Sequence, residues 1–340
     1  MHADIETDED YWGGRKVLVT GAGGFIGSHL VDRLVRQGAK VRAFVRYNSR
    51  GDHGLLRTLP QEIQSSLKII SGDLRDNDAV SKAVSGCDTV FHLGAVISIP
   101  YSYVHPLETT SSNVMGTLNM LLACRDQEVR RLVHTSTSEV YGTARRVPIS
   151  EDHPLQGQSP YSAGKIGADK LAESFYRSYE LPVVTVRPFN TFGPRQSARA
   201  VIPAIITQAL TQDVIRLGSL DPRRDFTYVA DTVRGFLLAA QIDSHDLIGN
   251  VFNLGSGEDI SIADLVTEIG ELLGRDLPVE IDAQRIRPAQ SEVMRLVADN
   301  RLAKNTFGWQ PRYSLSQGLE ETVEWIQSNL QLYRAGYYEI

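Results

Sequence analysis

Three glycines at three-residue intervals, Gly21, Gly24 and Gly27, stand between a short apolar run at 16–20 and a segment of helical periodicity at 25–37. An apolar run that enters a glycine turn is typical of a buried parallel strand. Because glycine has no side chain, the chain can turn tightly here and other groups can approach its backbone closely. A strand, a tight turn and a helix in this order predict one βα unit of a parallel sheet.

The same alternation of strand and helix continues along the chain. Further strands are expected at 41–45, 67–71, 89–93, 132–135 and 183–187. Helical patterns lie between them, notably at 112–126 and 163–179. The alternation predicts an α/β fold with a doubly wound (Rossmann) parallel sheet and helices on both of its faces.

The pattern changes after Pro188 to scattered helices and short extended pieces rich in Pro, Arg and Gly. We expect residues 14–187 to form the Rossmann domain and residues 188–330 to form mainly a smaller C-terminal α/β lobe for the substrate. Two segments of this lobe, at 225–229 and 250–254, are expected to return to the main sheet. The lobe should close over the carboxyl edge of the sheet, where ligands of such folds bind.

Composition and charge argue against several classes of function. The chain is 42% hydrophobic and 22% charged, and its net charge of -6 gives no reason to expect nucleic acid or a membrane as a partner. Cys87 and Cys124 lack the spacing of metal ligands and are expected to be reduced thiols. Residues 1–12 are acidic and lack the apolar stretch of a signal peptide, and no apolar run is long enough to span a membrane. These features predict a cytoplasmic protein without a bound metal.

The glycine turn has the context that a dinucleotide-binding site requires, since it follows a strand and opens a helix. The helix N-terminus offers free N–H groups and the positive end of its dipole to a pyrophosphate. Residues after the third strand are placed to reach an adenine, and residues after the fourth are placed to line the path from phosphate to nicotinamide. The alternative is an ordinary tight turn. The expected cofactor residues are Gly21, Gly24, Phe25, Ile26, Gly27, Arg46, Asp73, Leu74, Leu93, Ala95, Tyr161 and Lys165.

The end of the second strand bears on the choice of cofactor. An acidic residue there binds the ribose 2′-hydroxyl of NAD, whereas an arginine accommodates the 2′-phosphate of NADP. The chain has Arg46 at this point and no acidic residue until Asp52. We therefore expect NAD or NADP, with a lean toward NADP, although an arginine in a loop can equally be a solvated surface residue.

A second set of polar residues can carry out proton chemistry beside the cofactor. Tyr161 and Lys165 stand four residues apart at the start of a helix and so share one face. A nearby ammonium favours the phenolate, so the pKa of Tyr161 is expected to fall toward the working range. Tyr161 would then take a hydroxyl proton while the carbon loses hydride, and Lys165 would also hold the nicotinamide ribose. The alternative is that the two side chains only cover the surface.

These motifs together resemble an extended short-chain dehydrogenase/reductase of the NAD-dependent epimerase/dehydratase family that acts on a nucleotide sugar. The resemblance runs from residue 16 to about residue 325, and within the family it is nearest to the nucleotide-sugar 4,6-dehydratases of the legionaminic-acid pathway type. It is carried by the segments FVRYNSR at 44–50, TSTSEVYG at 135–142 and RPFNTFGPRQ at 187–196.

The resemblance implies a role for each matching position. Thr137, Tyr161 and Lys165 would form the oxidation triad, and Glu139 would remove the C5 proton. Many dTDP-glucose dehydratases have an Asp acid where this chain has Ser138. In this respect the chain resembles GDP-mannose dehydratases, whose Glu serves as both base and acid, and UDP-glucuronate decarboxylases. The alternative for Glu139 is a capping or surface carboxylate.

A nucleotide sugar also needs groups that bind its diphosphate, and arginine forks suit it. The resemblance implies that Asn190 and Arg224 face the phosphates or the sugar, and that Arg287 closes over the nucleotide. Arg195 is a further candidate, whereas Arg199 is a weaker one. Each of these arginines could instead form an ion pair, with Asp225, Asp231 or Glu292 as candidate partners.

The expected activity is that of an NDP-sugar 4,6-dehydratase, with UDP-N-acetylglucosamine as the substrate implied by the resemblance. The alternatives are a UDP-glucuronate decarboxylase, a C4 epimerase that needs no role for Glu139, and a non-catalytic NAD(P)-binding regulator, which would be expected to lose Tyr161 or Lys165. The helices at 112–126 and 163–179 carry more apolar residues than one sheet face requires. Since the equivalent pair forms a four-helix interface in the family, we expect a homodimer.

Overall fold

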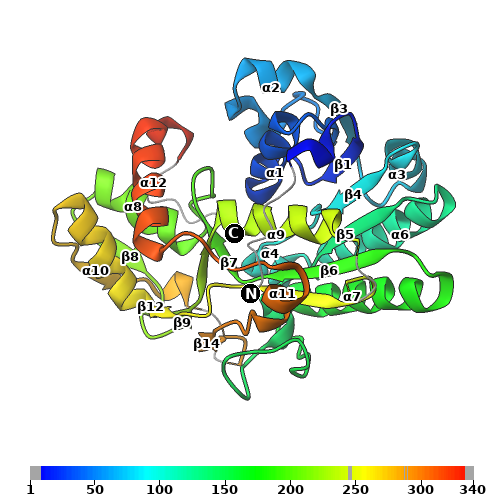
Figure 1. Cartoon of the computed structure of the whole chain (residues 1–340). Coiled ribbons are helices and arrows are strands. Elements are labelled where there is room, and N and C mark those ends of the chain that lie inside the picture. The colour runs from blue at the N-terminus through cyan, green and yellow to red at the C-terminus, as the bar shows by residue number, and fades with distance from the viewer. Residues whose placement is uncertain (1–8, 244–246, 287, 289, 334–340) are drawn as a thin grey trace.

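The computed structural model describes residues 9–243, 247–286, 288 and 290–333, and a seven-stranded sheet lies at its centre (Figure 1). All neighbouring strands are parallel, in the order β11-β6-β5-β4-β1-β2-β3. The sheet strands are β1 (Lys16–Thr20), β2 (Lys40–Arg46), β3 (Lys68–Gly72), β4 (Thr89–His92), β5 (Arg131–Thr135), β6 (Val183–Pro188) and β11 (Val251–Leu254). The order reverses direction between β1 and β4, and such a switch point is where doubly wound sheets bind ligands. The predicted fold class is confirmed.

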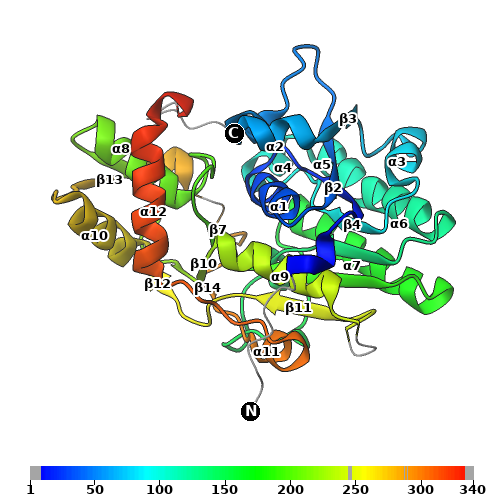
Figure 2. The same ribbon diagram turned by 45° about the horizontal axis from the view of Figure 1, so that its top comes forward.

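Helices cover both faces of this sheet (Figure 2). On one face α1 and α9 pack against each other, and on the other face α6 packs against both α3 and α7. The sheet separates two hydrophobic clusters, one that includes Leu30 and Phe236 and another that includes Met120 and Phe175. The covering helices are α1 (Phe25–Arg36), α3 (Asn77–Val84), α6 (Gly116–Asp126), α7 (Pro160–Tyr179) and α9 (Val229–Gln241).

Helix α7 begins at a well-defined cap. The Ser159 hydroxyl accepts a hydrogen bond from the Ser162 backbone N–H, and the Ser162 hydroxyl accepts one from the Ser159 backbone N–H. The two bonds form a reciprocal capping box. Pro160 occupies the first helical position, where its missing N–H has no cost. The cap places Tyr161 and Lys165 in the first two turns, on one face of the helix.

Most of the described residues that follow Pro188, apart from α9 and β11, form a smaller lobe beside the carboxyl edge of the sheet, seen on the left of Figures 1 and 2. It holds three small sheets, with strand orders β10-β7, β12-β9-β14 and β13-β8. Their strands are β7 (Asn190–Phe192), β8 (Ile215–Leu217), β9 (Arg223–Arg224), β10 (Phe226–Tyr228), β12 (Ile260–Ser261), β13 (Val279–Ile281) and β14 (Arg295–Leu296). Its helices are α8 (Val201–Thr211), α10 (Ile262–Leu273) and α12 (Leu315–Ser328), while α11 (Arg301–Phe307) contacts β11.

One of the two segments expected to return to the main sheet does not do so. The segment expected at 250–254 forms β11 and pairs with β6. The segment expected at 225–229 forms β10, which pairs with β7 in a separate two-stranded sheet. The prediction was wrong because both edges of β6 are paired, with β5 and with β11, and β10 instead pairs with β7, which follows β6 along the chain.

The loops and short helices between the main elements complete the layers. A short π-helical segment, η3 (Ser111–Met115), joins α5 to α6. The shorter helices are α2 (Gln61–Ser66), α4 (Ile99–Val104) and α5 (Pro106–Thr110), with η1 (Glu9–Trp12), η2 (Gly54–Thr58), η4 (Ser138–Tyr141), η5 (Ala283–Arg285) and η6 (Leu330–Leu332). None of the helices among the described residues is long and apolar enough to cross a bilayer.

Candidate active site

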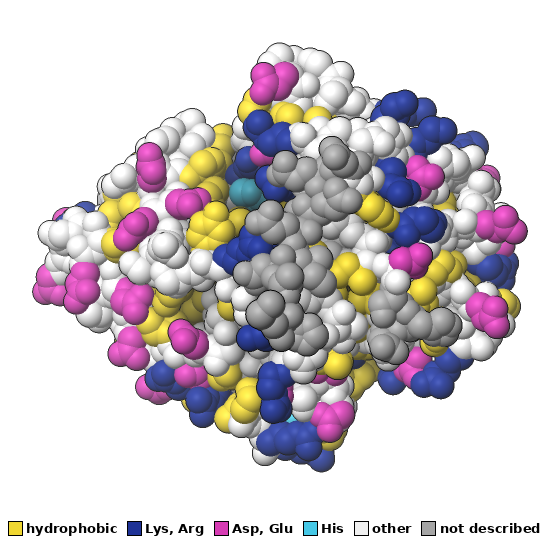
Figure 3. Space-filling model, viewed as in Figure 1, with side chains coloured by type: hydrophobic (Ala, Val, Ile, Leu, Met, Phe, Trp, Pro, Cys, Tyr) yellow, Lys and Arg dark blue, Asp and Glu magenta, His cyan; other side chains and the backbone are white. Residues whose placement is uncertain are grey.

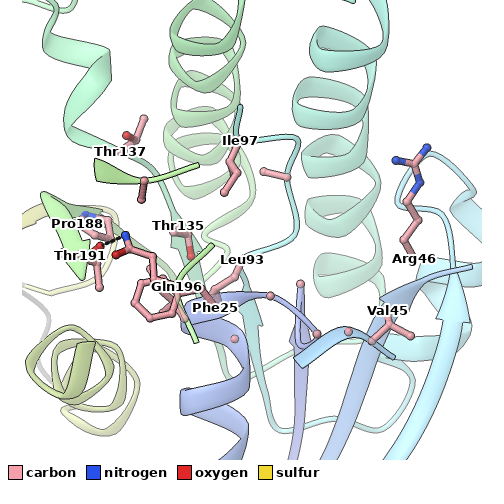
Figure 4. Close-up of a pocket in the computed structure, with 18 of the residues that line it drawn as sticks. Phe25, Val45, Arg46, Leu93, Ile97, Thr135, Thr137, Pro188, Thr191 and Gln196 are labelled. Carbon is pink, nitrogen blue, oxygen red and sulfur yellow. Dashed lines mark hydrogen bonds between the residues drawn. The ribbon is translucent and has the colours of Figure 1, made fainter. Parts of the chain in front are cut away.

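A cavity of about 980 Å³ crosses the carboxyl ends of β1, β4, β5 and β6. Figure 4 shows its two ends: Arg46 lies at one, Thr137 and Pro188 lie at the other, and Phe25 and Leu93 lie between them. The lining residues belong to the segments 21–27, 45–54, 93–99, 135–139, 161 and 188–200. The cavity therefore joins the glycine turn to the predicted proton-transfer residues.

The glycine turn is shaped so that a ligand can reach its backbone. Gly21 has φ 66°, and a Cβ there would lie 2.9 Å from the Gly94 nitrogen. A Cβ on Gly27 would collide with the Gly21 carbonyl oxygen. A Cβ on Gly23 would lie 2.6 Å from the His53 carbonyl oxygen, because the loop after β2 folds over the turn. The turn thus needs glycine where a pyrophosphate cradle needs it, and it fits a dinucleotide.

Most of the predicted cofactor residues line this cavity. Those that do are Gly21, Gly24, Phe25, Ile26, Gly27, Arg46, Leu93, Ala95 and Tyr161. Asp73 and Leu74 are not among the lining residues. The Asp73 carboxylate binds Arg75 at 2.6 Å, which lowers its pKa to about 2, and Leu74 packs where a Cβ on Gly94 or Gly116 would stand.

The loop after β2 closes the far end of the cavity. The Arg46 guanidinium is 70% exposed and pairs with Glu108 at 3.0 Å. Asn48 folds the loop, since its Oδ1 accepts from the Asp52 N–H at 2.9 Å and its Nδ2 donates to the Asp52 carbonyl at 2.6 Å. Arg50 also lines the cavity, so two arginines border this end. The arrangement suits an added phosphate on the adenosine ribose.

The other end of the cavity carries the proton-transfer groups. Thr137 and Glu139 follow β5, and Tyr161 comes from the first turn of α7. The Thr137 hydroxyl accepts from the Glu139 N–H at 3.2 Å and also hydrogen-bonds the Tyr161 hydroxyl. Lys165 is 4% exposed, and its ammonium donates to the Thr135 carbonyl at 2.6 Å. The structure therefore brings four of the five predicted catalytic residues together at one end of the cavity or directly beside it.

Ser138, the fifth predicted residue, differs from its neighbours. It is 3% exposed and is not among the residues that line the cavity. Thr137 is the extended residue that caps η4, and Ser138, the first residue of that helical turn, is buried, while Thr137 and Glu139 line the cavity.

The pKa of Tyr161 moves in the direction opposite to the one predicted. Burial raises it well above the ordinary value for a phenol, and the Glu139 carboxylate raises it further, while the hydrogen bond with Thr137 lowers it. Burial also lowers the pKa of Lys165 to about 8. The prediction was wrong because the ammonium is directed to the Thr135 carbonyl and because the cost of burying a phenolate is larger than the expected gain.

A second cavity of about 360 Å³ adjoins the first and shares Asn190, Thr191, Gln196 and Ala200 with it. Asn190 lines both cavities, and its side chain donates to the Asp225 carbonyl at 3.2 Å. Arg224 lines the second cavity and also forms an ion pair with Glu292 at 3.0 Å. The two alternatives expected for this residue, a place at the ligand and an ion pair, therefore do not exclude each other.

Two other predicted substrate residues have a different placement. Arg195 is not among the lining residues; its guanidinium reaches Asp32 of α1 at 3.4 Å and so ties the lobe to the Rossmann domain. Arg287 lies outside the described residues. Sequence reasoning missed Arg285 and Gln196, which line the second cavity. Gln196 ends the RPFNTFGPRQ segment and could have been included on that signal, whereas nothing in the sequence distinguished Arg285.

Known proteins match this chain over nearly its whole length. A family model described as GDP-mannose 4,6 dehydratase matches residues 18–322. A UDP-glucose 4-epimerase of Mycolicibacterium smegmatis is 33% identical over 93% of this chain and 100% of its own length. A trifunctional UDP-glucose 4,6-dehydratase of Arabidopsis thaliana, RHM1, is 30% identical over 93% of this chain. The match covers about half (47%) of the length of RHM1.

A solved structure of similar fold contains a bound NAD. The dTDP-glucose 4,6-dehydratase DesIV of Streptomyces venezuelae, solved with NAD and TYD bound, superposes with a TM-score of 0.84 at 28% identity, over 94% of this chain and 99% of its own. The family is NAD(P)-dependent, and the glycine turn described above fits such a cofactor. The chain belongs to the NAD-dependent epimerase/dehydratase family of extended short-chain dehydrogenases/reductases, whose members act on nucleotide sugars.

Proposed function

We propose that the protein is a 4,6-dehydratase of an NDP-hexose, with UDP-N-acetylglucosamine as the substrate that the sequence resemblance favours. One observation carries the proposal: Glu139 lines the cavity beside Thr137 and is close enough to Tyr161 to raise its pKa. A reaction confined to C4 needs no second base. A carboxylate at this point has a task only when a proton beside the new ketone must be removed.

The residues of the chain divide the work as follows. Tyr161 takes the proton of the C4 hydroxyl, and Thr137 hydrogen-bonds the same hydroxyl. Lys165 supports the phenolate and holds the cofactor ribose. NAD(P), when held by the glycine turn, would supply the hydride acceptor for C4 and the hydride donor for C6. The C4 ketone acidifies the C5 proton, which Glu139 removes.

Loss of the C6 hydroxyl as water requires a proton. Ser138 is not among the lining residues, and Asp52, a second lining carboxylate, belongs to the loop after β2. Among the described lining residues, Glu139 is thus the acidic group beside Thr137 and Tyr161. We therefore assign both steps to it: the carboxylate gains the C5 proton and passes it to the departing hydroxyl. C5 then takes up a proton from water, through the same carboxylate, as hydride is added at C6, and the product is a 4-keto-6-deoxy sugar.

Decarboxylation of a UDP-glucuronate is less well supported. That reaction calls for an arginine on the C6 carboxylate, beside the proton-transfer groups. The arginines among the described lining residues of the main cavity are Arg46, at the end of β2, and Arg50, in the loop after it. Figure 4 places Arg46 at the end opposite Thr137. Epimerisation at C4 is the second candidate, because an epimerase is among the relatives of similar identity.

Mass spectrometry of the purified protein with four substrates tests the proposal. The panel is UDP-N-acetylglucosamine, UDP-glucose, GDP-mannose and UDP-glucuronate, without added reductant or oxidant. We expect a product lighter by one water and no net consumption of cofactor. Loss of carbon dioxide from UDP-glucuronate alone would establish a decarboxylase. An unchanged mass with an altered NMR spectrum would establish an epimerase and contradict the role of Glu139.

We also propose that the protein is a homodimer through the face formed by α4, α5 and α7. Helices α4 and α5 both pack against α7, and this region carries exposed apolar side chains: Val104 is 61% exposed, Leu107 82% and Met115, in the adjoining turn, 47%. Neighbouring apolar side chains with this exposure fit a second copy of the same face. Light scattering at micromolar concentration should give twice the mass of 37.6 kDa, and a mass of one subunit would contradict this.

A further inference from the structure

A buried polar cluster lies directly behind Lys165, and Asp169 is at its centre. Asp169 stands one helical turn after Lys165 on α7 and is 5% exposed. Its Oδ2 accepts from the Ser136 hydroxyl at 2.7 Å and from Arg187 Nη2 at 2.9 Å. Its Oδ1 lies 3.2 Å from His134 Nε2, which donates because an ionised carboxylate only accepts. The carboxylate thus joins α7 to β5 and β6.

The hydrogen bond that Lys165 makes does not compensate the positive charge of its buried ammonium. Its ammonium is buried and donates to the Thr135 carbonyl, which is a neutral acceptor. An ammonium removed from water is strongly disfavoured unless an anion compensates it. Within the part of the chain that the structure describes, Asp169, one helical turn away, is the charged group that acts on Lys165 to favour its ammonium form.

The other titratable groups around Lys165 do not supply that anion. His92 of β4 and His134 of β5 face it, and burial lowers the pKa of both rings, so they are neutral at pH 7. Arg187 of β6 is a second buried cation. The Glu139 carboxylate acts on Tyr161 from the cavity side. Burial acts to raise the pKa of Asp169, but hydrogen bonding with His134 and the neighbouring cations outweigh it, so the group stays ionised.

The same carboxylate also anchors the catalytic end of β5. It holds His134 and Ser136, which alternate along the chain with Thr135 and Thr137. Thr135 offers its carbonyl to Lys165, and Thr137 hydrogen-bonds Tyr161. A bond to every second residue fixes the direction of the residues between them, since successive residues of an extended segment face opposite ways.

We propose that Asp169 is the positioning residue of the Tyr161–Lys165 pair: it is the counter-anion of the buried ammonium, and through Ser136 and His134 it orients the Thr135 carbonyl toward Lys165. The role belongs to the hydroxyl-oxidising pair, which dehydratases and epimerases share. It therefore does not depend on which final reaction the protein performs. Asp169 itself touches neither cavity among the described residues.

The charge state of Lys165 can be measured without any substrate. The chain has seven lysines, so a holoprotein labelled with ¹³C at lysine Cε gives a simple NMR spectrum, in which Lys165 is the signal lost in Lys165→Met. We expect the Lys165 signal of the native protein to titrate near pH 8. Asp169→Asn should lower that midpoint by about one to three units, the usual effect of losing a close opposite charge. Asp169→Glu keeps the charge and should leave the midpoint nearly unchanged.

A second variant guards against failure of Asp169→Asn to fold, since it leaves Arg187 buried beside a neutral amide. Arg187→Met removes the competing cation and keeps Asp169, so the Lys165 midpoint should rise. When a substrate that the protein converts is available, the alkaline limb of the pH–rate profile of each charge variant should move in the same direction as the Lys165 midpoint of that variant. Ser136→Ala removes one hydrogen bond but no charge, and should lower the rate without moving the limb. If the Lys165 midpoint is unchanged in whichever of the two charge variants folds, the proposal for Asp169 is overturned. Absence of turnover on every sugar would count only against the proposed function.

Discussion

The ammonium of Lys165 donates to the backbone carbonyl of Thr135 at 2.6 Å, across the junction between α7 and the end of β5. The two residues are 30 positions apart in the sequence. Tyr161 stands one turn before Lys165, and Thr137 stands two residues after Thr135. This single bond therefore couples the helix that carries the phenol to the strand end that carries its hydrogen-bonding partner.

The burial of Lys165 predicts how stability depends on pH. Its pKa is about 8 in the folded protein against 10.5 as its ordinary value, so the unfolded chain binds more protons between these two pH values. The free energy of unfolding contributed by this group must rise as pH increases from 8 to 10.5, by up to about 3 kcal/mol. Urea unfolding of the cofactor-free protein, compared with Lys165→Met, isolates the effect. A difference between the two proteins that is constant across this range would contradict it.

Substitution of Glu139 should separate oxidation from dehydration. Glu139→Gln keeps the size and hydrogen bonding of the side chain but cannot take up the C5 proton. Hydride transfer at C4 should survive, while loss of water should fall by at least about 100-fold, the usual scale for a removed general base. Deuterium exchange at C5 in heavy water, followed by mass spectrometry, reports the missing step. If Glu139→Gln dehydrates at the native rate, the assignment of the base is wrong.

Arg46 should decide between the two dinucleotides. Arg46→Asp places a carboxylate where it accepts from the ribose 2′-hydroxyl of NAD and repels the 2′-phosphate of NADP. We expect the ratio of the two dissociation constants to move toward NAD by at least about tenfold, which corresponds to about 1.4 kcal/mol. Calorimetric titration of cofactor-free protein measures both constants. Arg177→Ala, which removes an exposed pair with Glu173 on α7, is the matched control and should leave the ratio unchanged.

The glycine turn gives a test with an internal control. Gly27→Ala drives a Cβ against the Gly21 carbonyl, so we expect loss of cofactor binding and a lower melting temperature. Gly164→Ala lies inside α7, where the nearest atoms are 3.8 Å and 3.9 Å from the new Cβ. It should raise the free energy of unfolding by about 0.5–1 kcal/mol, because alanine loses less backbone entropy than glycine in a helix. Thermal unfolding with and without NADP distinguishes the two outcomes.

Several features of this protein followed from local sequence alone. The run at 16–20, the glycines after it and the periodicity at 25–37 predicted β1, the turn and α1, because each depends on residues within one turn or strand. The spacing of Tyr161 and Lys165 likewise predicted their shared helical face. Local propensity and hydrophobic period determine such elements before any long-range contact forms.

Tertiary structure decided what depends on groups brought from distant parts of the chain. The segment at 226–228 pairs with β7 because the edge of β6 was already taken by β11. Arg195 turned to Asp32 of α1, and Lys165 to the Thr135 carbonyl. The pKa of Tyr161 rose instead of falling, because burial and neighbouring charges, unlike helical spacing, are properties of the packed molecule.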